Sequence, residues 1–177
     1  MAFTESFKET EGQPLILRWA KALKHYAETG PVTIFDDGRH EWRMAPGTGF
    51  NLYWYKGDSH FARQLVAAGE DALSLLEEDI GAKPERTIEV YVYGNTAALQ
   101  SSLIYPDEWT GAVAFTEYGI VALGISVRQL SWGEDAMAHE MAHLVVHQAT
   151  MNGYGIVLPT WLDEGLAMYA EGPLSGD

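Results

Sequence analysis

Two histidines four residues apart constrain this chain more than any other feature. His139-Glu140-Met141-Ala142-His143 lies inside an apolar run that extends to about Val146. On an α-helix, side chains at positions i and i+4 lie on one face about 6 Å apart, so both imidazoles can converge on one cation. Glu140 is offset around the helix and is placed to hydrogen-bond a water beside that cation. The pattern therefore predicts a helix that carries a metal site.

A third ligand has to come from elsewhere, because a catalytic zinc takes three protein ligands and keeps one position open for water. His147 is a poor third ligand, since the outer histidines of such a row lie about 12 Å apart along a straight helix. A glycine three residues after His143 and a histidine three further on would offer another solution. Val146 and Ala149 occupy those positions. The remaining candidate is Glu164.

Glu164 lies one turn into a helix predicted from Thr160 to just before Gly172-Pro173. A loop that contains Asn152-Gly153 lets this helix fold back beside the first one, and Gly165 is expected to permit close helix–helix approach. Two alternatives stay open. Glu164 is also a residue that the helix dipole favours in a first turn, and the two histidines are also explained as a solvated pair at the edge of the core.

The two motifs together resemble those of the gluzincin peptidases, the clan of thermolysin and aminopeptidase N, and more closely the bacterial peptidase MA-like family. The similarity rests on the segments 139–143 and 161–169 and extends, more weakly, through the aromatic segments 35–42, 52–58 and 90–93. It implies a zincin-like metallopeptidase domain that hydrolyses peptide bonds. It also implies a zinc ion on His139, His143 and Glu164, with Glu140 as the general base. Asp163 then either holds a histidine N–H or only caps its helix.

The resemblance also indicates what is incomplete. Gluzincins carry a tyrosine or histidine from a later helical region that stabilises the oxyanion, and that C-terminal helical part is expected to be truncated here. Tyr154 is a weak substitute, and Tyr169 is expected in the core. An inert peptidase-like domain that keeps its metal site as a binding or scaffold module is the alternative function, and a chance motif without metal is the third interpretation.

Substrate binding is expected at the segment before the metal helix. The aminopeptidase branch of the clan carries a Gly-x-Met-Glu-Asn motif whose glutamate binds the free α-amine of the substrate. The matching stretch is Gly111-Ala112-Val113-Ala114-Phe115, with an alanine in place of the glutamate. Glu117 is nearby but follows the predicted turn. Endopeptidase-like activity is therefore expected, and the family resemblance implies an extracytoplasmic parent protein.

The order of predicted elements indicates an α+β domain with a small mixed or antiparallel sheet packed on the metal helix. The elements are, in chain order, a helix over 15–28, a hairpin of 32–35 and 40–44, a strand over 50–55, a helix from Asp58 or Ser59 to about Ile80 that ends at Gly81, a half-buried strand over 87–93, a short helix over 96–103, a hairpin of 112–115 and 120–125, and helices from Ser131 and Thr160. Ser131 with Glu134, and Thr160 with Asp163, match the capping box. Residues 1–56 are predicted to form a tail, a helix and a β-rich segment, and 57–177 the metallopeptidase domain.

Composition limits the partners. Hydrophobic residues make up 47% of the 177, enough for a core, and the net charge of −14 disfavours a nucleic acid. The absence of cysteine excludes disulfides, thiol catalysis and Cys-ligated metal. No run of 18 apolar residues is present, and the start of the chain has no signal-peptide pattern. The expected partner is a peptide or protein substrate, with no membrane contact and a monomeric state.

Overall fold

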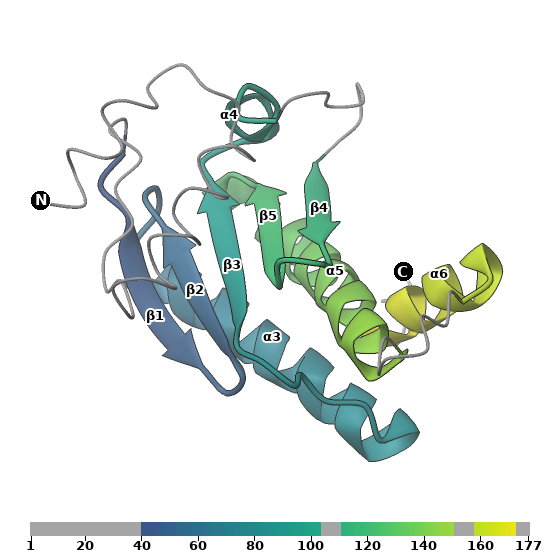
Figure 1. Cartoon of the computed structure of the whole chain (residues 1–177). Helices are drawn as coiled ribbons and strands as arrows, with labels where there is room; N and C mark the ends of the chain where they lie inside the picture. Colours follow the sequence, from purple (N-terminus) through teal and green to yellow (C-terminus); the bar gives the residue numbers. More distant parts are fainter. Residues whose placement is uncertain (1–39, 104–110, 151–157, 173–177) are drawn as a thin grey trace, which may run out of the picture.

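A computed structural model describes residues 40–103, 111–150 and 158–172. Its centre is a five-stranded sheet in the order β1-β2-β3-β5-β4 (Figure 1). The strands are β1 (Arg43–Gly47), β2 (Phe50–Trp54), β3 (Ile88–Tyr93), β4 (Ala112–Phe115) and β5 (Ile120–Gly124). The three inner strands run parallel, and the edge strands β1 and β4 are antiparallel to their neighbours. The sheet is therefore mixed, as an α+β domain of this kind predicts.

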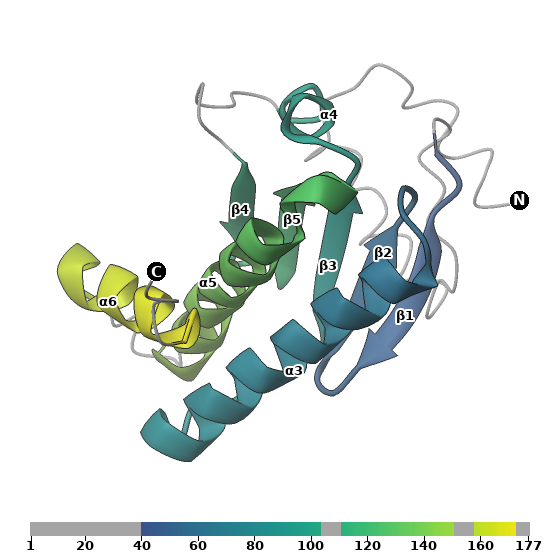
Figure 2. The same ribbon diagram turned by 180° about the vertical axis from the view of Figure 1, so that it is seen from behind.

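Two long helices cover one face of the sheet (Figure 2). The first is α3 (Ser59–Ile80), and its ends are as predicted. The Asp58 carboxylate accepts hydrogen bonds from two backbone N–H groups of the first turn, and Gly81 ends the helix with a φ of +68° that favours glycine. The second is α5 (Leu130–Thr150), which lies beside α3 and beneath β4 and β5. Both helices pack on the apolar core of that face, and the core includes Leu52, Val90 and Met141.

The opposite face of the sheet carries a second cluster, built from aromatic residues. Trp42, Tyr53, Tyr91 and Tyr93 are buried in it, and the rings of Tyr53 and Tyr91 stack with centroids 4.8 Å apart. Because β3 lies between this cluster and the helices, five of its six residues are buried. The expectation of a half-buried strand over 87–93 was wrong, since a central parallel strand is covered on both faces.

The start of the helix that carries His139 and His143 differs from the prediction. A short 3₁₀ turn, η1 (Val127–Gln129), precedes α5, and the capping box is formed by Ser126 and Gln129 instead of Ser131 and Glu134. The predicted cap of the last helix is wrong as well. Helix α6 (Thr160–Ala170) begins after Pro159 without a side-chain cap.

Four smaller expectations were also corrected. The predicted strand over 40–44 is β1, which begins at Arg43 and pairs with β2 through a turn at Thr48 and Gly49, whereas its predicted partner over 32–35 lies outside the described residues. The short helix α4 (Thr96–Gln100) ends before Leu103. A Cβ atom added at Gly165 would meet no atom within 4 Å, so this glycine does not mediate helix packing. Tyr169 is 48% exposed and not in the core.

Some predictions fall outside this description. The helix over 15–28, the strand over 32–35 and Tyr154 lie outside the described residues. The division at residue 56 stays a prediction, although β1 and β2 share one sheet with the later strands. Within the described ranges, none of the helices combines the length and hydropathy needed to span a bilayer.

Candidate metal centre

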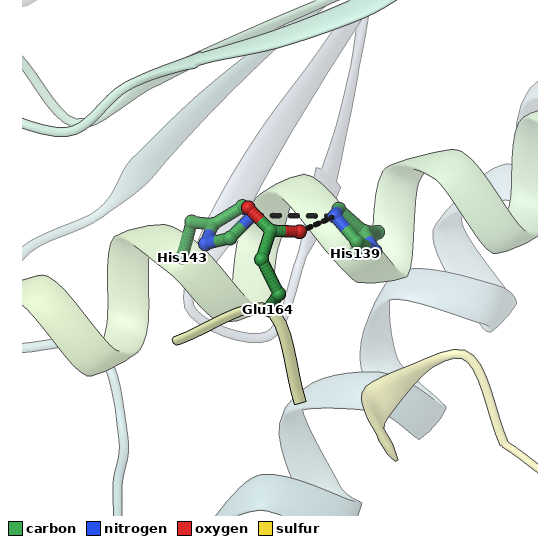
Figure 3. A group of neighbouring side chains, drawn as sticks. All are labelled: His139, His143 and Glu164. Carbon is green, nitrogen blue, oxygen red and sulfur yellow. Dashed lines mark hydrogen bonds and ion pairs between the residues drawn. The ribbon is translucent and has the colours of Figure 1, made fainter. Parts of the chain in front are cut away.

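The two histidines of α5 point their rings at the same spot. His139 and His143 lie one turn apart, and their Nε2 atoms are 3.2 Å from each other. Helix α6 packs against α5 and brings Glu164 to the same spot (Figure 3). One Glu164 oxygen lies 3.5 Å from Nε2 of His139, and the other lies 3.9 Å from Nε2 of His143. The three residues predicted from sequence are therefore brought together by two helices.

The second nitrogen of each ring faces a carboxylate. Nδ1 of His139 lies 2.6 Å from Oε1 of Glu171, and Nδ1 of His143 lies 3.1 Å from Oδ2 of Asp163. A carboxylate accepts a hydrogen bond, so in the neutral rings the proton sits on Nδ1. Each Nε2 atom then presents a lone pair toward the other ring and toward the carboxylate of Glu164. Three electron-rich atoms that face one another without a proton between them suit a cation.

The spacing of these atoms fits a small divalent ion. Ligands at about 2.1 Å from a tetrahedral zinc ion are about 3.4 Å apart, close to the 3.2, 3.5 and 3.9 Å observed. All three ligand atoms lie within 4.8 Å of one another, and His147 is not part of this group. The Glu164 side chain is 51% exposed, which leaves one side of the group open to solvent. The arrangement offers three ligands and an accessible fourth position.

Glu140 lies on the same helix between the two histidines and is partly buried. Burial raises the pKa of its carboxyl group, and this effect is opposed by the positive charge that His143 and His139 can carry and by the backbone N–H of Ala114. A carboxylate in this position can accept a proton from a water held beside the two histidines. Its position fits the predicted role of general base.

Edge strand β4 passes beside this carboxylate. Backbone bonding alternates along an antiparallel pair, and the N–H of Gly124 donates to the carbonyl of Gly111 at 2.8 Å. Ala112 and Ala114 therefore direct their N–H and C=O groups to the free edge, where the Ala114 N–H meets Glu140. Glu140 therefore lies next to the free edge of the sheet.

Comparison with known families agrees with this geometry. A family model described as the peptidase MA superfamily matches residues 68–177, which is more than half of the chain. The chain belongs to the peptidase MA superfamily. The match begins within α3 and covers both helices of the metal group. Membership in the peptidase MA superfamily confirms the resemblance found in the sequence, and the observed α+β fold agrees with it.

Curated proteins match only in short stretches. An isethionate sulfite-lyase from Oleidesulfovibrio alaskensis is 71% identical over 35 residues, which is 20% of this chain and 4% of that protein. The same-named proteins of Desulfovibrio desulfuricans (60% over 35 residues) and Nitratidesulfovibrio vulgaris (71% over 34) cover 20% and 19% of this chain and 4% of their own length. The chain therefore spans about 4% of these relatives, and the peptidase MA match covers far more of it.

Sequence reasoning missed one residue of this peptidase MA centre. Glu171 follows Glu164 by seven residues, which is two helical turns and thus the same face of α6. That periodicity was available as a signal. Asp163 was predicted either to cap its helix or to hold a histidine N–H, and in the structure its carboxylate contacts His143. Tyr169 donates its hydroxyl hydrogen to Asp79 of α3 at 2.5 Å, so its hydroxyl is engaged on α3.

Proposed function

We propose that this chain is a zinc-dependent peptidase domain of endopeptidase type. The observation that carries the proposal is the convergence of the Nε2 atoms of His139 and His143 on the Glu164 carboxylate, with both Nδ1 atoms already held by carboxylates. Nitrogen and carboxylate ligands in this number are those of catalytic zinc sites. Zinc bound there supplies a Lewis acid that polarises a carbonyl oxygen and makes a bound water more acidic.

The residues of the chain would divide the remaining work. Glu140 accepts a proton from the attacking water and then delivers it to the nitrogen of the leaving amine, so that one carboxylate serves both proton transfers. Glu171 and Asp163 fix the orientation and tautomer of His139 and His143.

The substrate would bind as an extended strand. The free edge of β4 offers the N–H and C=O groups of Ala112 and the C=O group of Ala114, and a peptide that pairs with them lies alongside Glu140. Ala114 occupies the position at which the aminopeptidase branch has its amine-binding glutamate, and an alanine cannot pair with an ammonium group. Glu117 lies in the exposed turn beyond β4. These features favour cleavage within a chain over cleavage that requires a free N-terminus.

The partners and location remain parts of the proposal. Peptides or proteins are the proposed substrates, and a nucleic acid is disfavoured by the net charge of −14. A monomeric state is proposed, and a location outside the cytoplasm is proposed from the family resemblance. The alternative is an inert module that keeps the metal site for binding. It shares the ligands and differs only in turnover.

One experiment separates these functions. The zinc-loaded chain is incubated with a fluorescence-quenched peptide blocked at both ends, with and without a chelator, beside a variant that lacks both histidines (H139A/H143A). Chelator-sensitive cleavage by the wild type alone supports the peptidase. One zinc per chain with no cleavage of a broad peptide mixture supports the inert module, and no zinc contradicts both.

A further inference from the structure

We propose that Arg86 is a positioning residue that holds the edge strand β4 in register along the metal helix α5. The proposal rests on the proposed function, because it assigns to β4 the role of substrate edge. Arg86 lies in the connection between α3 and β3. It is far in sequence from His139, His143 and Glu164 and belongs to neither of the two motifs that contain them. It contacts both α5 and the turn that follows β4.

The side chain of Arg86 fastens the turn at the end of β4. Its Nη2 donates to the carbonyl oxygen of Glu117 at 2.7 Å and to that of Thr116 at 3.1 Å. The guanidinium also lies against Gly119, whose φ is +70°, and a Cβ atom there would come within 3.1 Å of Nε. Two hydrogen bonds from a charged group to successive carbonyls fix the direction of this turn.

The backbone at Arg86 is tied to the end of α5. Oε1 of Gln148 accepts hydrogen bonds from the N–H of Glu85 at 2.9 Å and from the N–H of Arg86 at 3.4 Å. Gln148 is only 7% exposed and lies in the last turns of α5. A buried amide that accepts two backbone bonds is costly to displace. Arg86 therefore bridges the far end of the metal helix and the far end of the edge strand.

The near end and the middle of β4 are fastened to α5 as well. The ring of Trp132, in the first turns of α5, lies so close to Gly111 that a Cβ atom there would come within 2.5 Å. In the middle, the Ala114 N–H meets the Glu140 carboxylate. The strand is therefore contacted from the first turns of α5 at Gly111 and faces Glu140 at Ala114, and Arg86 holds the turn that follows it.

This arrangement has a consequence for binding. A substrate strand that pairs with the free edge takes its alignment from β4, so the contacts that hold the turn after β4 bear on how well a bound strand faces Glu140. Loss of Arg86 leaves the ligands, Glu140 and Trp132 in place. Its effect is therefore expected on substrate binding, with the metal group intact.

The test compares Arg86→Ala and Arg86→Lys with Arg63→Ala, a matched control at an exposed arginine of α3 outside this network. Each zinc-loaded chain is assayed with the doubly blocked fluorescence-quenched peptide, and hydrogen exchange is followed over residues 112–124. We expect Arg86→Ala to bind one zinc, to raise KM about tenfold with kcat changed less than about twofold, and to exchange faster over 112–118 but not over α3. Arg86→Lys, which keeps a charged donor, should recover most of the KM.

Two results would overturn the proposal. One is unaltered exchange over the hairpin in Arg86→Ala. The other is a fall in kcat with KM unaltered, since a smaller folded fraction produces that pattern without any positioning role. If the wild type cleaves no peptide, the proposed function fails. Hydrogen exchange then decides alone whether Arg86 holds β4, so the two failures remain distinct.

Discussion

Nδ1 of His139 lies 2.6 Å from Oε1 of Glu171, so the first histidine of α5 is held by a carboxylate at the end of α6. His143 has the matching contact with Asp163, at the start of the same helix. Each ring is therefore oriented by a residue outside the ligand set. The carboxylates that orient the ligands come from the helix that also supplies Glu164.

Replacement of Glu171 by alanine should weaken zinc binding without removing it. Outer carboxylates of this kind change metal affinity by about 10- to 100-fold. Competition with a chromophoric chelator measures the affinity, and Glu171→Gln should lose less because its amide oxygen still accepts the Nδ1–H bond. Equal affinity in wild type and Glu171→Ala would show that the contact does not orient the ring.

Replacement of His143 by alanine should abolish stoichiometric zinc, because two ligands remain where three are needed. His147→Ala is the matched control, one turn along α5 and outside the group, and should keep about one zinc per chain. Elemental analysis of both proteins after gel filtration gives the ratio. One zinc retained by His143→Ala would mean that the ligand set is wrong.

Replacement of Glu140 by glutamine should leave zinc and fold in place and lower peptidase activity by roughly 10²- to 10⁴-fold, as expected for loss of a general base. Glu134→Gln, on the same helix before the histidines, controls for the loss of a negative charge. Steady-state rates with the blocked peptide measure the effect. Undiminished activity in Glu140→Gln would remove this residue from the mechanism.

Matched peptides with free and acetylated N-termini should be cleaved at similar rates, because Ala114 offers no carboxylate to an α-amine. Product analysis by mass spectrometry distinguishes internal from terminal cleavage. A strong preference for the free amine that Glu117→Ala abolishes would show that the amine-binding group had been misplaced.

Replacement of Glu89 by glutamine should stabilise the fold at neutral pH. Burial raises the pKa of Glu89 above 4.5, against the hydrogen bonds of Tyr53 and Asn51. A carboxyl group with a higher pKa in the folded state binds more protons when folded, so its ionisation lowers stability as pH rises above about 4.5. Glutamine carries no such penalty.

The measurement is thermal unfolding of metal-free wild type and Glu89→Gln from pH 4 to pH 8. The variant's advantage should be small near pH 4 and largest above the raised pKa of Glu89. Glu85→Gln, at an exposed position, is the control and should follow the wild type. A stability difference that does not change with pH would contradict this account.

Much of the fold was predictable because its signals are local. Asp58 and Gly81 delimit α3 through contacts within one or two turns, and the spacing of His139 and His143 identified the metal helix. The caps of α5 and α6 were misassigned for the same reason. Ser131 matches the capping pattern, but the chain enters α5 through a 3₁₀ turn that is capped earlier, at Ser126. Asp163 also matches the pattern, but its carboxylate contacts His143. A capping pattern is read from one stretch of sequence, so it cannot show that a side chain has a partner on another helix.

The remaining features depend on contacts between distant segments. Glu171 meets a histidine 32 residues earlier, and Arg86 meets a turn about 30 residues later. Neither pairing leaves a pattern in one stretch of sequence, because each is set by how helices and strands dock. The burial of β3 on both faces likewise depends on its neighbours in the sheet.

The docking of α6 has a thermodynamic consequence. One ligand and both orienting carboxylates lie on α6 or at its end, while both histidines lie on α5. A divalent ion that binds only this docked arrangement adds to its stability by mass action, by about 2.7 kcal/mol when free metal is 100 times its dissociation constant. The ion is then a cross-link between two helices whose strength follows metal supply. We therefore expect α6 to undock more readily when metal is scarce, which would make the metal-free protein the more sensitive of the two forms to proteolysis at this helix.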